Sequence, residues 1–461
     1  MIIADKNTKA VDLVRAALEK AKEYEDYHAF ISMNEARALE RAREIDAKIE
    51  KGEPVGRLAG VPFALKDNYL SPEGDTTAAA KMLEDFVSPI TATAVKKIED
   101  EGAIMIGRAN LDAYAHGGST ENSYFGPTSN AYDKTRVAGG SSGGSAVAVA
   151  LDIVPFALGS DTGGSIRQPA SFNGVYGVKP TFGTVSRYGV VAMASSTDTM
   201  GCFAKTAADA DLVMSIMAGK DAKDSTSLND FWTKNLADAK PAKKKIGLIS
   251  DFMGEGVDED VKKVTKDYVA KLKKAGYEVE EVSMPILKYA LAIYYIVQPA
   301  EVASNLSRYD GVRYGHRSSD IKSLDDVYSK TRDEGFMPEN KRRILIGNFV
   351  LSSGFFDAYY LKAQKARTLL INAYNEAFEK FDALLCPVAP NPAFKLGENT
   401  SDPLKMYLED VMTVPPSMAG LPAMSVPAGK SKDGLPINVQ LVGPRQSDQM
   451  LLHIADELED K

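Results

Sequence analysis

The sequence predicts an α/β fold, and two kinds of periodicity lead to that prediction. Apolar residues recur at helical spacing over residues 8–26 and 34–51. Further along, residues 245–250, 257–275 and 277–282 have the pattern of a strand, a helix and a second strand. Strands that alternate with helices are typical of a sheet with helices packed against it.

The first half of the chain shows the same alternation around segments rich in glycine and serine. Short apolar runs predict strands at 58–65, 103–107 and 154–158. Helical patterns lie between them, at 91–101 and 145–151. Residues 286–380 are helical in pattern almost throughout, and we expect them to form a cap over the sheet.

Length alone would allow several domains, since 461 residues exceed the ~150 typical of one domain. No internal repeat or low-complexity segment divides the chain, and large α/β enzymes often form one unit. We therefore expect residues 1–461 to form one domain. It would consist of N-terminal helices over 1–55, a core over 58–218 and the helical region over 286–380.

Composition excludes several classes of protein. The net charge of −8 and the lack of a basic stretch argue against nucleic-acid binding by this chain alone. The two cysteines, Cys202 and Cys386, lack the spacing of a zinc site or a disulfide framework. The N-terminus MIIADKNTKAVDL lacks the apolar core of a signal peptide, and no apolar run approaches the ~20 residues of a membrane span. We expect a cytoplasmic protein with no membrane contact and no metal site.

Chemistry is concentrated in residues 138–179, where two Gly/Ser loops flank a predicted helix and strand. Such loops expose consecutive backbone N–H groups, which can hold an anion. A nucleotide phosphate loop is one interpretation, but no lysine follows either glycine pair at the spacing of GxxxxGK[ST]. A nucleophile elbow is another, because Gly139–Gly143 matches GxSxG around Ser141. The Ser–His–acid triad that accompanies such an elbow needs a downstream histidine and an acid. The two downstream histidines, His316 and His453, lie in unremarkable settings.

A lysine base is the third interpretation. Lys66 ends an apolar run in GVPFALKDN, where a charged ammonium would be costly to bury. Burial lowers the pKa of lysine, and a neutral lysine can act as a base. The alternative is a lysine that merely pairs with Asp67 or lies at the solvent end of a strand.

These motifs together resemble the amidase signature family. GGSSGGSA followed by GSDTGGSIRQPA, with KDN upstream, carries the resemblance, which extends from about Leu58 to Glu457. Later blocks, such as STENSYFGPTSNAYD and MYLEDVMTVPPSMAGLPAMSVP, are similar to its tRNA-dependent amidotransferase subfamily. The resemblance implies an α/β/α layered domain around a mixed, mostly parallel sheet.

It also implies a Ser–Ser–Lys triad. By position, Lys66 is the base, Ser141 the bridging serine in a cis peptide, and Ser165 the nucleophile. Ser142 is the alternative bridge. The oxyanion hole would be formed by backbone amides at Thr162, Gly163, Gly164 and Ser165.

In the subfamily, a tyrosine, an arginine and an aspartate hold the substrate glutamine. The matching positions are Tyr294, Arg343 and Asp410, with Tyr295 and Arg342 as the adjacent alternatives. Arginine would pair with the α-carboxylate of glutamine and aspartate with its α-ammonium. A standalone amidase acting on small aliphatic or aryl amides would need only the triad.

The resemblance further implies a heterotrimer. Ammonia released from glutamine would pass to a larger subunit that binds tRNA and ATP, with a small bridging subunit between them. There it would amidate Glu-tRNA(Gln) or Asp-tRNA(Asn). ATP and Mg²⁺ would serve that partner's step, so this chain would need no cofactor and would meet the misacylated tRNA only through its partner.

Overall fold

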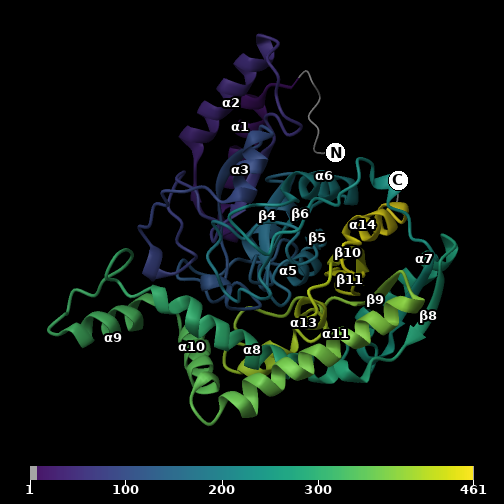
Figure 1. Cartoon of the computed structure of the whole chain (residues 1–461). Coiled ribbons are helices and arrows are strands. Elements are labelled where there is room, and N and C mark those ends of the chain that lie inside the picture. Colours follow the sequence, from purple (N-terminus) through teal and green to yellow (C-terminus); the bar gives the residue numbers. More distant parts are fainter. Residues whose placement is uncertain (1–7, 460–461) are drawn as a thin grey trace.

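The computed structural model describes residues 8–459, and it is built around one long sheet (Figure 1). The strands lie in the order β1-β3-β2-β4-β6-β5-β10-β11-β9-β7-β8. Their bounds are β1 Phe30–Met33, β2 Pro62–Lys66, β3 Ile104–Ala109, β4 Phe156–Asp161, β5 Tyr176–Lys179, β6 Thr199–Ala204, β7 Lys245–Ile249, β8 Glu278–Val282, β9 Ala383–Pro387, β10 Ala423–Lys430 and β11 Pro436–Val442.

Helices connect the strands and cover the sheet. They are α1 Ala10–Glu23, α2 Glu35–Glu50, α3 Thr93–Asp100, α4 Gly143–Ala150, α5 Arg167–Phe172, α6 Ala207–Met217, α7 Glu259–Lys274, α8 Ala290–Asn305, α9 Leu324–Gly335, α10 Pro338–Leu351, α11 Lys362–Lys380, α12 Pro403–Leu408, α13 Val414–Met418 and α14 Asp448–Glu457. A short π-helical turn, Phe356–Leu361, lies between α10 and α11.

Alternate residues of the strands enter different cores, and this makes the fold three-layered. In β2, Phe63 and Leu65 pack in a core with α3, α6, α7 and α14. Ala64 between them packs in a second core, with α1, α2, α4 and α5. At the far end of the sheet, Leu384 of β9 packs in a third core with α8, α11 and α13. Because side chains of a strand point alternately to its two faces, helices cover both sides. The predicted α/β/α fold is confirmed.

The sheet is mixed, as predicted, and parallel pairs do not predominate. Strands β3, β2 and β4 are parallel at one end, and β9, β7 and β8 at the other. Between them, β4, β6, β5, β10, β11 and β9 pair antiparallel, as do β1 and β3. Among the described strands, four pairings are parallel and six are antiparallel. The antiparallel middle of the sheet joins segments that precede and follow the long helical region. Periodicity could not indicate this pairing.

Most predicted elements lie close to the observed ones. The strand expected at 58–65 begins only at Pro62, because Leu58–Gly60 form a turn before it, and it extends to Lys66. The helix expected at 145–151 begins two residues earlier, at Gly143. The absence of a signal peptide was inferred partly from residues 1–7, which lie outside the described part of the chain. The single-domain division remains a prediction.

Helices α8 to α11 occupy the region predicted to be helical, and no described strand lies within 286–380. Figure 1 places α8, α10 and α11 along the lower border of the molecule, with α9 projecting from it.

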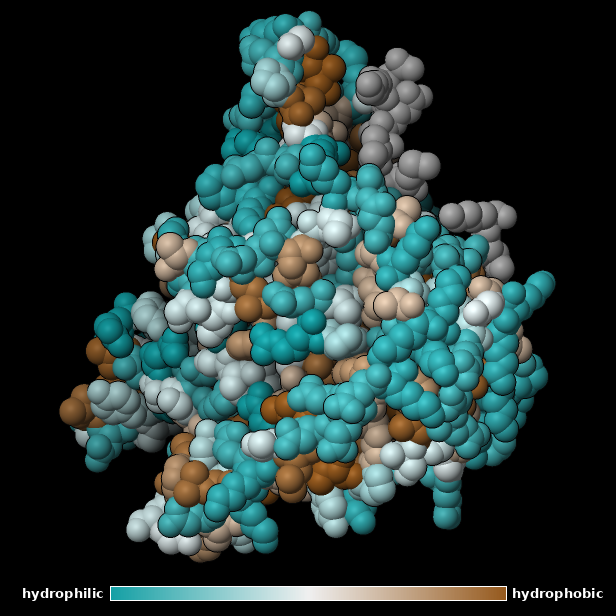
Figure 2. Space-filling view, turned by 45° about the vertical axis from the view of Figure 1, so that its right-hand side comes forward, coloured by the Kyte–Doolittle hydropathy of each residue, from teal (hydrophilic) through white to brown (hydrophobic). Residues whose placement is uncertain are grey.

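No single described helix is long and apolar enough to cross a membrane. The bent pair formed by α10 and Phe356–Lys380, with an angle of 99° between its parts, has the length and composition of a membrane span. Apolar side chains of α10, such as Leu345 and Phe349, are exposed. Figure 2 shows apolar patches on the lower part of one face and another at its upper end, on a surface that is otherwise mostly hydrophilic.

Candidate active site

Lys66 is the last residue of β2, and its ammonium group is fully buried. Nζ lies 2.8 Å from Ser141 Oγ and 2.7 Å from Ser142 Oγ. It also lies 3.0 Å from the hydroxyl and 3.2 Å from the carbonyl oxygen of Ser160, at the end of β4. Because β2 and β4 are parallel neighbours, their carboxyl ends meet at one edge of the sheet and bring these groups together.

Burial lowers the pKa of Lys66 to about 7, against the opposing influence of Asp112, Asp161 and Asp198. A substantial fraction of this lysine is therefore neutral near neutral pH. Asp67 is not its partner: the Asp67 carboxylate accepts hydrogen bonds from Thr77 and lies 3.7 Å from Arg108. The alternative of a simple Lys66–Asp67 ion pair does not describe this site.

Ser141 and Ser142 follow Gly140 in the first Gly/Ser loop, directly before α4. The peptide bond between Gly140 and Ser141 is cis, and the Gly140 N–H donates to Gln168 Oε1 at 2.9 Å. The Ser142 hydroxyl donates to the Ser160 carbonyl at 3.2 Å. Both hydroxyls lie at hydrogen-bonding distance from Lys66, so the lysine contacts alone do not distinguish the bridge from its neighbour.

Ser165 lies in the second loop, between β4 and α5, and is 7% exposed. Its carbonyl accepts the Ser142 N–H at 3.1 Å, which joins the two loops. No described residue forms a hydrogen bond with the Ser165 hydroxyl, so the structure does not show the expected link from Ser141 to Ser165.

The carboxylate of Asp161 holds the backbone of the second loop in place. Asp161 Oδ2 accepts the Ile166 N–H at 3.1 Å and pairs with the buried Arg167 guanidinium. The backbone N–H groups of Gly163 and Gly164 have no acceptor among the described residues. Gly164 has φ +153°, and a Cβ there would lie 2.3 Å from Thr413 Oγ1. The loop therefore presents free backbone amides, which are the donors that an oxyanion hole requires. Only glycine fits at position 164, because any Cβ there would overlap Thr413.

Beside these loops lies a cavity of about 290 Å³. Four separate segments line it: residues 112–122, Tyr295, residues 337–343 and residues 399–410. Arg343 and Asp410 both line it, so the structure brings together two of the three residues expected to hold glutamine. Tyr294 lies nearby, because a Cβ on Gly163 would be 2.8 Å from its hydroxyl.

Arg343 is held firmly inside this cavity. Its Nε donates to Glu339 Oε1 at 2.8 Å, and Nη1 donates to Gln298 Oε1 at 3.3 Å. Its guanidinium carbon lies 5.3 Å and 5.7 Å from the ring centroids of Tyr295 and Tyr407. These two hydrogen bonds use two of the five N–H donors of arginine.

Asp410 lines the same cavity as Arg343 and is close enough to be influenced by its charge. Burial raises the pKa of Asp410 to about 7, opposed by Arg343 and by a hydrogen bond from the Tyr295 hydroxyl. That hydroxyl donates to Oδ2 at 3.3 Å. Of the adjacent alternatives, Tyr295 thus contacts Asp410, whereas the partly exposed Arg342 is bound to Glu339.

Several contributors were missed from sequence. Ser160 is part of GSDTGG and touches Lys66. Glu339 lies one helical turn before Arg343 and also accepts the Tyr407 hydroxyl at 2.9 Å. The spacing of four residues between Glu339 and Arg343 was a usable signal, because side chains at i and i+4 meet on a helix. Among the described residues, no group of three or more His, Cys, Asp or Glu is arranged to hold a metal ion.

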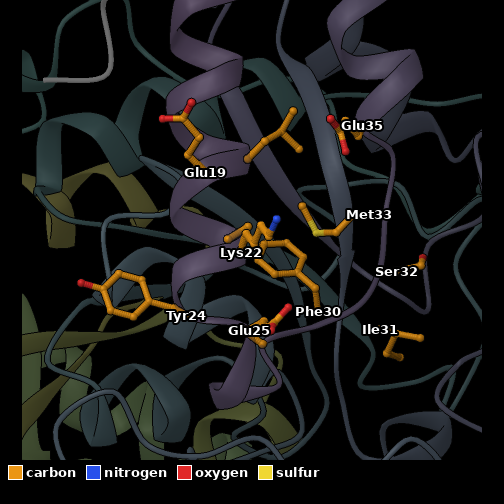
Figure 3. Close-up of a pocket in the computed structure, with 12 residues that line it drawn as sticks. Glu19, Lys22, Tyr24, Glu25, Phe30, Ile31, Ser32, Met33 and Glu35 are labelled. Carbon is orange, nitrogen blue, oxygen red and sulfur yellow. The ribbon is translucent and has the colours of Figure 1, made fainter.

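A separate hollow of about 570 Å³ lies at the N-terminal edge of the sheet, between α1 and β1 (Figure 3). Its lining includes Phe30 and Met33 together with Glu19, Lys22 and Glu35. It shares no lining residue with the serine loops or with the cavity of Arg343 and Asp410. The candidate active site is therefore at the carboxyl ends of β2 and β4.

Comparison with known proteins identifies the family of this chain. The family model described as Amidase matches residues 12–452. The A subunit of the glutamyl-tRNA(Gln) amidotransferase of Cyanothece sp. is 48% identical over 458 residues, which cover 98% of this chain and 95% of that protein.

Two solved structures are similar over nearly the whole chain. The A subunit of the glutamyl-tRNA(Gln) amidotransferase of Thermotoga maritima superposes with a TM-score of 0.81 at 38% identity, covering 98% of this chain and 92% of that one. A bacterial aryl acylamidase superposes with a TM-score of 0.86 at 26% identity, covering 98% and 93%. The chain belongs to the amidase family.

Proposed function

We propose that this member of the amidase family hydrolyses glutamine and supplies the ammonia for amidation of Glu-tRNA(Gln). One observation carries the proposal: a guanidinium and a carboxylate, Arg343 and Asp410, line one cavity beside the Gly/Ser loops. Free glutamine carries an α-carboxylate and an α-ammonium on a single carbon, which opposite charges held close together can recognise. Similarity to the A subunits of glutamyl-tRNA(Gln) amidotransferases supports the same conclusion.

In the first half of the reaction, Ser165 Oγ attacks the side-chain amide carbon of glutamine. Its proton passes to Ser141, and the Ser141 proton passes to the neutral amine of Lys66. The carbonyl oxygen becomes an oxyanion, which the backbone amides at Thr162–Ser165 stabilise. The C–N bond then breaks, the nitrogen takes up the proton held by Lys66, and ammonia leaves a γ-glutamyl ester on Ser165.

In the second half, water replaces ammonia. Lys66, neutral again, takes a proton from the water through Ser141 while the water oxygen attacks the ester carbon. The bond from carbon to Ser165 Oγ breaks, Oγ regains a proton, and glutamate leaves. Lysine can repeat this role because burial holds its pKa at about 7, where both protonation states are accessible.

Transfer of the ammonia requires partner subunits. The net charge of −8 makes this chain a poor binder of tRNA phosphates on its own. A larger subunit would bind the tRNA and use ATP with Mg²⁺ to activate the misacylated residue, and a small subunit would bridge the two chains. Relatives whose names make them one subunit of such an enzyme support this assembly. Asp-tRNA(Asn) is the second candidate acceptor.

The test is ammonia release from glutamine and from a simple amide such as propionamide, by the chain alone and with co-purified partners. We expect slow hydrolysis of glutamine alone and faster hydrolysis in the complex with ATP and Glu-tRNA(Gln). Replacing Glu-tRNA(Gln) by Asp-tRNA(Asn) in the same assay distinguishes the two acceptors.

A standalone amidase for aliphatic or aryl amides is the alternative, favoured by the similarity to an aryl acylamidase. Such an enzyme would use the same serines and lysine. It would not require the ion-pairing groups Arg343 and Asp410. A preference for simple amides over glutamine, with no response to partners, would establish this alternative and refute the proposed glutaminase.

A further inference from the structure

We propose that Gln168 is a further substrate-binding residue, whose side-chain amide donates a hydrogen bond to the α-carboxylate of glutamine. This inference rests on the proposed function and adds a contact to it. Gln168 is in α5, three residues after Ser165, and is fully buried.

The orientation of the Gln168 side chain is fixed by the first Gly/Ser loop. The Gly140 N–H donates to its Oε1 at 2.9 Å. Because an N–H can be accepted only by the oxygen of a side-chain amide, the NH₂ group must occupy the other position. That nitrogen, Nε2, is buried and has no hydrogen-bond partner. A buried donor without a partner is rare in folded proteins, and each one calls for an explanation.

The unpartnered nitrogen lies beside residues that line the substrate cavity. A Cβ built on Gly118 would lie 3.6 Å from Gln168 Nε2, 3.7 Å from Met406 Sδ and 3.8 Å from Asp410 Oδ1. Gly118, Met406 and Asp410 all line the cavity. The space left open by the missing side chain of Gly118 is thus bordered by the Gln168 amide on one side and the Asp410 carboxylate on another.

The chemistry of this space identifies the substrate group. Gln168 Nε2 is a donor, so it needs an acceptor. Glutamine offers two, its side-chain carbonyl and its α-carboxylate. The carbonyl must lie at the oxyanion amides for reaction, and the α-ammonium is bound by Asp410. The α-carboxylate is attached to the same carbon as that ammonium, which brings it close to Gln168 Nε2. Arg343 keeps further N–H donors for the same carboxylate.

The two ends of this side chain join substrate recognition to the catalytic loop. Oε1 holds the backbone directly before Ser141, and Nε2 reaches the substrate. A substitution that removes both functions would therefore not separate them. Gln168→Glu does separate them, because a carboxylate still accepts the Gly140 N–H but offers no N–H to the substrate.

The experiment measures ammonia release by Gln168→Glu at mildly basic pH, where the new carboxylate is ionised. The substrates are glutamine and 4-aminobutanamide, the analogue in which hydrogen replaces the α-carboxylate. We expect KM for glutamine to rise at least about 10- to 100-fold, because the variant loses a hydrogen bond to a charged group and also places a like charge beside the α-carboxylate. KM for 4-aminobutanamide should not rise, and kcat for both should be retained. Gln364→Glu, the same substitution on α11 outside the site, is the matched control.

Gly118→Ala is the second variant. A methyl group there makes ordinary contacts with its neighbours and lies between Nε2 and the ligand, so it too should raise KM for glutamine. Equal losses on both substrates, or an unchanged KM for glutamine in either variant, would overturn the role of Gln168. Failure of the wild-type protein to hydrolyse glutamine, while it hydrolyses simple amides, would instead refute the proposed function.

Discussion

The serine–lysine cluster and the substrate cavity adjoin each other but are completed in different ways. In the cluster, Lys66, Ser142 and Ser160 are hydrogen-bonded to one another, with every contact between 2.7 and 3.2 Å, and Lys66 also contacts Ser141. The Ser165 hydroxyl is the exception, because it has no hydrogen-bond partner among the described residues. In the cavity, Arg343 keeps donors that its protein contacts do not use, and Glu121 Oε2 and the nearby Gln168 Nε2 have no partner.

This difference separates the two tasks of the site. Groups that carry out a reaction gain from being arranged before substrate arrives, since no reorganisation is then needed at the moment of reaction. Groups that select a substrate can stay incomplete, because the correct ligand supplies the missing hydrogen bonds and a wrong one leaves them unmade. Substitutions in the cluster should therefore lower the rate for every amide, and substitutions in the cavity should affect glutamine selectively.

The largest effect should come from Ser165→Ala. Removing the nucleophile should lower kcat by at least about 10⁴-fold for glutamine and for simple amides alike. The fold should be retained, because alanine is small and the Ser165 hydroxyl makes no hydrogen bond with a described residue. Ammonia release and circular dichroism check the two parts. Retention of activity on simple amides would show that another group attacks them.

Lys66→Ala should come next, with a loss of about 10²–10⁴-fold in kcat for both substrates, as expected for a general base. The same assay resolves the bridge. If Ser141 relays the proton, Ser141→Ala should approach the loss of Lys66→Ala, while Ser142→Ala should cost much less. The reverse order would assign the relay to Ser142, which lies equally close to the lysine.

Arg343→Ala should have a smaller and selective effect. A lost hydrogen-bonded ion contact of about 1.5–3 kcal/mol corresponds to a rise of roughly 10- to 150-fold in KM for glutamine. Propionamide, which has no α-carboxylate, should be unaffected. Lys341→Ala on the same helix is the matched control, since the Lys341 side chain pairs with Asp333 and does not line the cavity. Equal losses on both substrates would give Arg343 a structural role only.

The smallest predicted difference is in pH dependence. Lys66 must be neutral to act, and its pKa of about 7 makes kcat/KM fall as pH drops through that value. Asp410 must be ionised to bind the α-ammonium, and its pKa of about 7 adds a second loss in the same direction. The acid limb should therefore be steeper for glutamine than for propionamide. Profiles of equal steepness would remove Asp410 from ammonium binding.

The cluster could be located from sequence because its parts lie in short, compositionally unusual segments. Two Gly/Ser loops frame the serines, and Lys66 stands out as a charge at the end of an apolar run. The contact of Lys66 with Ser160 could not be foreseen, because it depends on β2 and β4 lying side by side in the sheet. Periodicity predicts strands but does not give their neighbours.

The cavity was much less accessible to sequence reasoning. Its charged residues come from segments far apart in the chain, and Arg343 and Asp410 were expected only from a family resemblance. Nothing in the sequence indicated Gln168, since its role depends on the Gly140 N–H fixing the orientation of its amide. The antiparallel centre of the sheet was missed for a related reason, because β5 and β10 pair across more than two hundred intervening residues.

Identification of the covalent intermediate tests the role of Ser165 most directly. Protein mixed with glutamine and quenched in acid can be digested and analysed by mass spectrometry. We expect a γ-glutamyl group on the peptide that contains Ser165, absent from Ser165→Ala and strongly reduced in Arg343→Ala at limiting glutamine. A γ-glutamyl group on Ser141 or Ser142, or ammonia release from glutamine in the Ser165→Ala protein, would contradict it.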